Sequence, residues 1–136
     1  MIRAATHQEI TILCNHTGLV PTPYCKGISL VLDNRTVAVV GYDRWTENAV
    51  EMHIWLENAR YMKKSFIREA FSYPFIQGDR GLVIGITPGN NAPALEFNRR
   101  LGFTQVHRIV DGNAVGEDLV IQEMRRDNCK WIRTWH

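Results

Sequence analysis

The stretch GLVIGIT, residues 81–87, constrains the fold more than any other, because apolar residues occupy both of its alternating sets of positions. A strand of this kind is covered on both faces, which is typical of parallel pairing. Parallel strands need a crossover connection, and the preceding residues 58–71 have the apolar spacing of a helix that Pro74 ends or kinks near Tyr73. Its apolar stripe consists of Met62, Phe66, Ile67, Ala70 and Phe71. Residues 50–87 therefore predict a right-handed strand–helix–strand unit.

A three-stranded antiparallel meander is predicted ahead of that unit. Its strands are residues 28–32, 37–45 and 50–57, with turns at 33–35 and 46–48. In the last strand, one set of positions holds Val50, Met52, Ile54 and Leu56, and the other holds Glu51, His53, Trp55 and Glu57. Successive side chains of a strand point to opposite faces. We therefore expect one face of this strand to meet the core and the other to face polar surroundings.

Residues 85–103, GITPGNNAPALEFNRRLGF, predict a strand that runs through a Pro-Gly turn into a helix. Asn90 or Asn91 can cap the start of this helix, and Pro93 suits its first turn. Gly102 supplies the left-handed residue that ends it.

An N-terminal helix and a C-terminal pair of strands complete the predicted elements. Thr6 and Glu9 have the spacing of a capping box, and Gly18 marks the end of the helix. Residues 104–110 and 118–124 predict two strands joined by the glycine-bearing DGNAVGE. The fold class is α/β (α+β), with a mixed, mostly antiparallel sheet, a parallel strand pair and flanking helices.

The length and hydropathy bound the class of protein. A chain of 136 residues that is 45% apolar supports one core, so we expect a single domain over residues 1–136, with its core at about 28–126 and a tail at 127–136. No run approaches the roughly 18 apolar residues of a membrane span, and the first residues lack the apolar run of a signal peptide. We expect a soluble, cytoplasmic protein without a membrane partner.

The cysteines and the net charge bear on disulfide formation, metal binding and nucleic-acid binding. Cys14, Cys25 and Cys129 form no CxxC pair and leave one thiol over in any disulfide scheme, which fits a reducing compartment and predicts no metal site. A net charge of +2 is too small to indicate nucleic acid by itself. The C-terminal RRDNCKWIRTWH mixes cations with rings, but a tail whose tryptophans fold back on the core is favoured over a nucleic-acid site.

Three cations crowd one end of the helix predicted at residues 58–71. Arg60, Lys63 and Lys64 lie in its first turn, where the helix dipole disfavours each cation by roughly 0.3–1 kcal/mol. A phosphate bound to the free N–H groups of that turn would compensate for this cost. Alternatively, the three side chains point to solvent with Glu57 as a partial counterion, and the spacing does not distinguish the two.

The element order over residues 28–126 resembles the GNAT superfamily of acyl-CoA-dependent N-acyltransferases. The family pattern N-x-x-A-x-x-x-Y-x-x-x-G-F agrees with this chain at every position except the tyrosine. The corresponding residues are Asn91, Ala94, Asn98, Gly102 and Phe103. Within that superfamily, the chain also resembles small GNAT-like proteins carried by bacteriophages, which would place it in the host cytoplasm.

The resemblance implies a site for acetyl-CoA, as co-substrate, between two splayed strands that end near Leu56 and Thr87. Asn91 would hold the pantetheine arm, and a backbone N–H around residues 54–56 would be the oxyanion donor. The cofactor-binding residues expected in this way are Ile54, Trp55, Leu56, Arg60, Tyr61, Met62, Lys63, Lys64, Ser65, Thr87, Asn91, Ala94 and Phe97.

Two departures from the family pattern bear on catalysis. The stretch ENARYMKKS, residues 57–65, stands where the family has a glycine-containing pyrophosphate loop. Glycines let backbone N–H groups approach a phosphate closely, so in this chain the cations of the stretch would partly take over the binding of phosphate. Asn98 stands where the family has a tyrosine that protonates the departing thiolate, and an amide is not an acid. Losing a general acid costs about 10²–10⁴-fold, which predicts a slow or water-assisted enzyme. Tyr42 and Tyr61 are less favoured alternative acids.

The candidate base lies on the polar face of the strand at residues 50–57. Glu51, acting through water, or His53 could deprotonate an amine there. The alternative is an ordinary solvated strand face. We expect Trp45 and Trp55, with the loop at residues 20–25, to wall the acceptor side.

These features predict an N-acetyltransferase that moves an acetyl group from acetyl-CoA to a primary amine by direct attack. Asn98 and the glycine-free loop keep open an alternative, a catalytically weak or inactive GNAT-like binding or virion-associated module of a phage. Nucleic-acid binding through the tail is less favoured. Exposed strand edges leave a homodimer open, and the acceptor amine is not defined by these residues.

Overall fold

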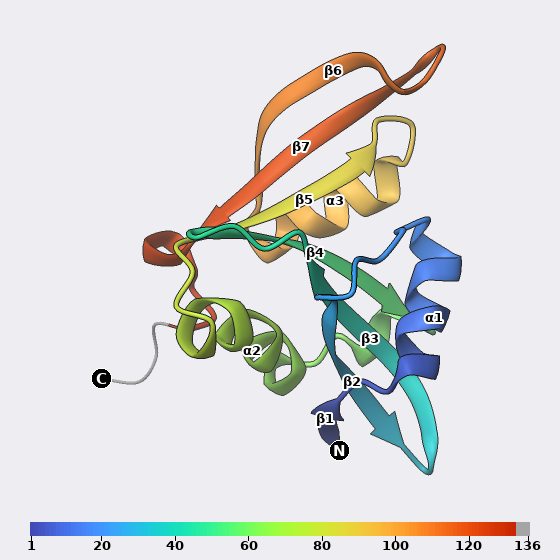
Figure 1. Ribbon diagram of the computed structural model, residues 1–136, viewed down its shortest axis with the longest axis vertical. Helices are drawn as coiled ribbons and strands as arrows, with labels where there is room; N and C mark the ends of the chain where they lie inside the picture. Colours follow the sequence, from blue (N-terminus) through green and yellow to red (C-terminus); the bar gives the residue numbers. More distant parts are fainter. Residues whose placement is uncertain (133–136) are drawn as a thin grey trace.

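The computed structural model describes residues 1–132, which form one seven-stranded sheet with the order β1-β2-β3-β4-β5-β7-β6 (Figure 1). The strands are β1 (Ile2–Ala4), β2 (Lys26–Leu32), β3 (Arg35–Asp43), β4 (Ala49–Leu56), β5 (Leu82–Pro88), β6 (Thr104–Ala114) and β7 (Glu117–Arg125). The α-helices are α1 (His7–Thr17), α2 (Lys64–Ser72) and α3 (Ala92–Leu101). Shorter helical segments are η1 (Ala59–Tyr61), η2 (Tyr73–Gln77) and η3 (Arg126–Asn128).

The predicted fold class is confirmed, because β4 and β5 pair in parallel and the other neighbouring strands pair antiparallel. The β2–β3–β4 meander lies where residues 28–57 predict it. Its first turn is tight, with φ of 51° at Asp33 and 60° at Asn34, the left-handed conformation that a two-residue hairpin turn requires. The three-residue β1, which pairs with β2, was not predicted.

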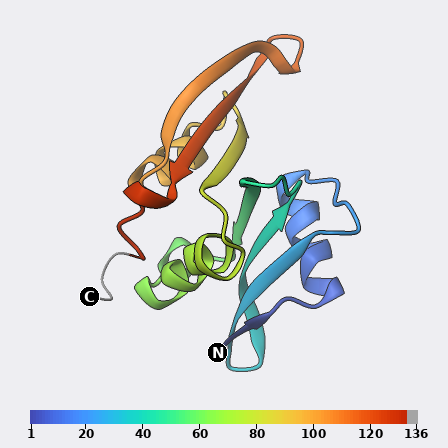
Figure 2. The ribbon, with the colours of Figure 1, turned by 60° about the vertical axis from the view of Figure 1, so that its left-hand side comes forward.

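The parallel pairing of β4 with β5 is short. Ala49, Val50 and Glu51 pair with Leu82, Val83 and Ile84, and the two strands then separate toward Leu56 and Pro88. The splayed parallel pair expected from the family resemblance is therefore present. Figures 1 and 2 show α1 along the β2–β4 half of the sheet and α3 along the β5–β7 half.

The core lies mainly on the face of the sheet that α2 covers. Val50, Val83, Phe66 and Phe71 are fully buried there. The other face of the meander packs against α1 at close range, because a Cβ at Gly41 would lie 2.3 Å from Cδ2 of the fully buried Leu13. A larger residue at position 41 would therefore require the Leu13 side chain to move.

The helix predicted over residues 58–71 is interrupted, which corrects that expectation. The side chain of Asn58 accepts a hydrogen bond of 3.0 Å from the Arg60 N–H and caps the 3-10 turn η1. The backbone of Lys63 is extended, with ψ of 155°, so α2 begins at Lys64. Arg60 therefore lies outside the first turn of α2, and the crowding of cations there is smaller than predicted.

The other predicted helix ends agree with the structure. Thr6 and Glu9 form the capping box of α1, and Gly18 ends it at φ of 77°. Oδ1 of Asn91 accepts from the Ala94 N–H at 3.3 Å, and Gly102 ends α3 at φ of 118°. The α-helical part of α2 ends at Ser72, before Pro74, and continues as the π-helical η2.

The C-terminal residues extend the core beyond the predicted limit of residue 126. Cys129 is fully buried, and Nε1 of Trp131 donates a hydrogen bond of 2.8 Å to the Leu101 carbonyl oxygen. The expectation that the tail folds back on the core is confirmed for Trp131, whereas Trp135 and the rest of residues 133–136 lie outside the described residues. Over residues 1–132, no helix is long and apolar enough to cross a membrane.

Candidate functional site

A cleft of about 560 Å³ lies where β4 and β5 separate. Residues of both sheet faces line it, because β4 and β5 leave a gap through the sheet at this point. On the α2 and α3 face the lining residues are Met52, Ile54, Leu56, Ala59, Gly85, Thr87, Asn91, Ala94, Phe97, Asn98 and Phe103. On the α1 face they are His16, Thr17, His53, Ile86 and Pro88. A long, thin ligand can therefore pass from one face of the sheet to the other.

The side of the cleft formed by α3 is held by side-chain amides. Asn98 donates from Nδ2 to Oε1 of Gln122 at 3.0 Å, and Nε2 of Gln122 donates to the Leu95 carbonyl oxygen at 3.2 Å. A Cβ at Gly85 would lie 3.8 Å from Nδ2 of Asn98, which is an ordinary contact distance, so a larger residue would fit there. The glycine leaves the cleft wider than a residue with a side chain would.

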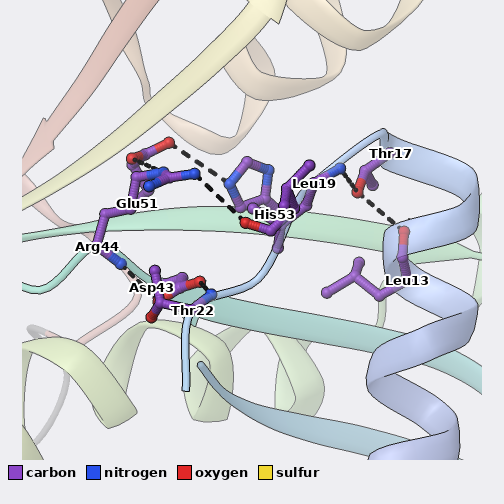
Figure 3. A network of polar contacts seen from close by, with 9 residues as sticks. Leu13, Thr17, Leu19, Thr22, Asp43, Arg44, Glu51 and His53 are labelled. Atoms are coloured by element: carbon purple, nitrogen blue, oxygen red, sulfur yellow. Dashed lines mark hydrogen bonds and ion pairs between the residues drawn. The ribbon is translucent and has the colours of Figure 1, made fainter. Parts of the chain in front are cut away.

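The two candidate bases lie next to each other on the α1 face, where His53 lines the cleft and Glu51 lies beside His53 without lining it (Figure 3). Nε2 of His53 lies 3.6 Å from Oε1 of Glu51, and Oε2 of Glu51 lies 3.3 Å from Nε of Arg44. The side chains of Glu51 and His53 are 13% and 14% exposed. Nε2 of His53 is buried and has no hydrogen-bond partner among the described residues. A ligand that reaches this atom can supply the missing partner.

The N-terminal turn of α2 provides a candidate site for an anion. Lys63, the N-cap residue, makes no side-chain capping bond, and the side chains of Lys63 and Lys64 are exposed. The first N–H groups of a helix have no intrahelical acceptors. They and the two ammonium groups can contact one phosphate.

Arg60 and Tyr61 form a separate cluster on η1. Arg60 donates to the Tyr61 hydroxyl at 3.0 Å and stacks over its ring, and Arg35 approaches the same oxygen at 3.5 Å. The hydrogen bond from Arg60, reinforced by the positive charge of Arg35, lowers the pKa of Tyr61. Tyr61 is 7% exposed and lies outside the lining of the cleft.

The predicted site residues fall into two groups. Those that line the cleft are His53, Ile54, Leu56, Thr87, Asn91, Ala94, Phe97 and Asn98. Those that do not line it are Glu51, Trp55, Arg60, Tyr61, Met62, Lys63, Lys64 and Ser65. Of these, Trp55 stacks on His16 with ring centroids 5.3 Å apart, and Met62 packs against the core.

Several lining residues had no signal in the sequence. His16 and Thr17 reach the cleft only because α1 packs beside β4, and Ile86 and Pro88 line it because β5 diverges there. Tyr42 is excluded as an acid at this site. It is fully buried, donates to the Ala70 carbonyl oxygen at 2.6 Å, and has a pKa raised by burial.

Neither Trp45 nor Trp55, which are predicted to wall the acceptor side, lines the cleft, and that wall stays a prediction. Trp45 lines a second cavity with Tyr24 and Tyr73, away from the cleft. Over residues 1–132, no group of three or more His, Cys, Asp or Glu side chains could hold a metal ion.

The fold occurs in solved acetyltransferase structures. A single-substitution variant of the spermidine N-acetyltransferase SpeG from Vibrio cholerae superposes with a TM-score of 0.79 at 11% identity, covering 98% of this chain and 96% of that chain. The same enzyme with manganese ions gives a TM-score of 0.74 at 11% identity, covering 92% and 91%. A structure described as a probable acetyltransferase gives 0.62 at 17% identity, covering 76% and 62%.

Comparison of the sequence with protein-family models and with curated proteins finds no match. The structural likeness therefore establishes the fold and nothing finer. Residues 1–132 have the fold of the GNAT acetyltransferases, with a mixed seven-stranded sheet and, within that range, a cleft at its single parallel strand pair.

Proposed function

We propose that the protein transfers an acetyl group from acetyl-CoA to a primary amine, which attacks the thioester directly. The observation that carries this proposal is the cleft at the point where β4 and β5 separate, lined from both faces of the sheet, with His53 among its lining residues and Glu51 beside His53. A thioester on a long arm and a separate amine can approach one point from opposite faces of such a sheet. The fold shared with acetyltransferases is consistent with this reaction.

The described residues fit acetyl-CoA in two parts. The apolar lining of the cleft, including Ile54, Leu56 and Phe97, suits the pantetheine arm, and Asn91 at the start of α3 offers a polar contact. Because β4 diverges from β5 there, the edge of β4 that faces β5 is available for backbone hydrogen bonds. The phosphates would bind at the uncapped start of α2, with Lys63 and Lys64.

The chemistry needs a base for the amine. His53 is the side chain of the candidate pair that lines the cleft, and its Nε2 has no hydrogen-bond partner among the described residues. The amine nitrogen forms a bond to the thioester carbon, the carbon–sulfur bond breaks, and His53 takes the proton that the nitrogen loses. Glu51, 3.6 Å from Nε2, stabilises the resulting imidazolium. A backbone N–H around residues 54–56 would be the oxyanion donor.

Asn98 supports a second candidate function, a catalytically weak or inactive GNAT-like binding or virion-associated module of a phage. The amide of Asn98 is bonded to Gln122 and has no acidic proton to give the thiolate. In this alternative acetyl-CoA binds but is not consumed. In the proposed enzyme, by contrast, the departing thiolate takes its proton from water, and turnover is slower than it would be with an acidic side chain at this position.

A homodimer and a cytoplasmic location complete the proposal. Every residue of β6 is exposed, including Val106 and Val110, so this sheet edge can pair with the β6 edge of a second copy. Sedimentation of the purified protein would give a monomer mass if this pairing does not occur.

Thiol release in the presence of acetyl-CoA and a panel of primary amines tests the activity. We expect amine-dependent release, and we expect His53→Gln to slow it about 100-fold with the affinity for acetyl-CoA unchanged. His7→Gln, which alters an exposed histidine at the start of α1, is the matched control. Thiol release that is equal in wild type and His53→Gln would remove His53 from the mechanism, and tight acetyl-CoA binding without turnover would favour the binding module.

A further inference from the structure

The α1-side face of the β5–β7–β6 half of the sheet is apolar. The strand register places Ile84 opposite Glu51 on one side and Glu123 on the other. In the following rungs, Ile86 lies opposite Ile121, and Pro88 lies opposite Leu119. Leu119 in turn lies opposite Ile109 of β6, and Ile121 lies opposite His107, so one histidine borders these apolar residues. Paired residues share a face, so Ile84, Ile86, Leu119, Ile121 and Ile109 form one surface, here called the apolar face.

The side chains of the apolar face are more exposed to solvent than those on the opposite face of the same strands. Val83, Val120 and Met124, whose side chains point to the opposite face near α3, are 0–2% exposed. Ile84, Ile86, Leu119 and Ile121 are only partly buried, and Ile109 is 38% exposed. Helix α1 packs on β2, β3 and β4, while α3 packs on β5 (Figures 1 and 2). A contiguous apolar surface that no helix covers is a candidate binding site.

The apolar face continues into the cleft. Ile86 belongs to both, because it lines the cleft beside His53 and Pro88. Glu51 is the β4 neighbour of Ile84 in the strand register, so the candidate bases stand at the edge of this face. A molecule whose amine reaches Nε2 of His53 therefore rests its remaining atoms on Ile84, Ile86 and Ile121.

Two of the carboxylates at the edge of the apolar face are paired with cations. Oε2 of Glu51 lies 3.3 Å from Nε of Arg44, and Oε2 of Glu123 lies 3.2 Å from NH2 of Arg125. Glu51 and Glu123 therefore each have a cation, and Glu117 at the start of β7 accepts from the side-chain amides of Asn90 and Asn113, so the edge offers only a small net attraction to a polycation. An uncharged apolar group needs no such charge partner, and it is stabilised by leaving water to contact the apolar face.

We propose that the acceptor is a primary amine with a single charge and an apolar body, such as an arylalkyl or long alkyl amine, and that the apolar face binds this body. The proposal rests on the proposed acetyl transfer and names its acceptor class. It sets this chain apart from a polyamine enzyme, because a polyamine would carry further ammonium groups over isoleucine and leucine side chains.

Matched acceptors and matched variants test the proposal. With acetyl-CoA saturating, we expect kcat/KM for 2-phenylethylamine to exceed those for ethanolamine and spermidine by about tenfold or more. Ile121→Ser should lower the phenylethylamine value about tenfold and leave the ethanolamine value and acetyl-CoA affinity unchanged. Val115→Ser, which alters a 96% exposed side chain at the hairpin tip, should change neither.

A binding measurement keeps the test independent of turnover and of the folding of the variant. In wild-type protein, with and without CoA, 2-phenylethylamine should shift the backbone NMR signals of Ile84, Ile86 and Ile121 at lower concentration than spermidine does. Shifts confined to other residues, or a preference for spermidine, would overturn the proposal. So would a dimer that Ile121→Ser converts to monomer, because the face would then be a subunit interface. Absence of acetyl-CoA binding would instead refute the proposed function, while the amine shifts would still report on the acceptor class.

Discussion

The side chain of Asn98 is tied to Gln122 by a hydrogen bond of 3.0 Å from Nδ2 to Oε1. Gln122 is in turn anchored by its own amide, which donates to the Leu95 carbonyl oxygen at 3.2 Å. Asn98 stands on α3 at the position where the GNAT pattern has its acidic tyrosine, and it lines the cleft. At the position of the tyrosine in that pattern, this chain therefore has an amide held by a hydrogen bond.

Restoring a phenol at this position should restore proton transfer to the thiolate. We expect Asn98→Tyr to raise the rate of thiol release about tenfold, at the low end of the effect of a general acid, because a thiolate leaves tolerably without help. Asn98→Phe is the matched control, since it also loses the bond to Gln122 but supplies no proton. Equal rates for the two variants, measured at saturating acetyl-CoA and amine, would show that thiolate protonation does not limit turnover.

The cations at the start of α2 should hold phosphate. Lys63→Ala/Lys64→Ala should weaken CoA binding about tenfold or more, because charge-assisted hydrogen bonds contribute roughly 1.5–3 kcal/mol each. The affinity for acetyl-pantetheine, which has no nucleotide, should not change. Lys26→Ala/Lys130→Ala removes the same charge elsewhere and serves as the control in calorimetry. Unchanged CoA affinity in the α2 variant would place the phosphates at another site.

Acid stability should depend on Glu9, which joins α1 to the sheet. Burial opposes its ionisation, but hydrogen bonds from Arg3, Thr36 and the Thr6 N–H hold the pKa of Glu9 at about 2, below its ordinary 4.5. Its stabilising contribution is therefore present above about pH 4.5 and is lost as the pH falls toward 2.

Replacing this carboxylate by an amide gives a direct test in urea unfolding at several pH values. Glu9→Gln should lower the free energy of unfolding at pH 7 by roughly 2–3 kcal/mol and flatten its decline below pH 5. The pKa of Glu96 is also about 2, held down by Arg99 and Arg100, but its side chain is 45% exposed. Glu96→Gln should change little, because solvent screens its ion pairs. An acid limb that is identical in Glu9→Gln and wild type would contradict this account.

The parts of the fold that follow from local chemistry could be predicted from the sequence. The capping box at Thr6 and Glu9 and the Asn91 cap with the Gly102 stop each depend on residues a few positions apart. The break before α2 was missed, since apolar spacing over residues 58–71 is continuous and nothing in it marks the extended Lys63. The short β1 was missed because it is stabilised only by its pairing with β2.

The candidate site was predicted in part for the same reason. Asn91, Asn98 and the alternating Glu51 and His53 belong to recognisable local patterns, and His53 and both asparagines line the cleft. The approach of His16 to the cleft depends on how α1 packs on the meander, and the bond between Asn98 and Gln122 joins residues 24 positions apart. Such contacts leave no periodic trace in one sequence.

The central claim is that the cleft between β4 and β5 binds acetyl-CoA, and calorimetric titration of the purified protein tests it most directly. The account predicts one site per chain with an affinity in the micromolar range, reduced by Lys63→Ala/Lys64→Ala. No detectable heat up to millimolar acetyl-CoA, together with no binding of CoA, would contradict the account and leave the protein with the fold of an acetyltransferase but not its co-substrate.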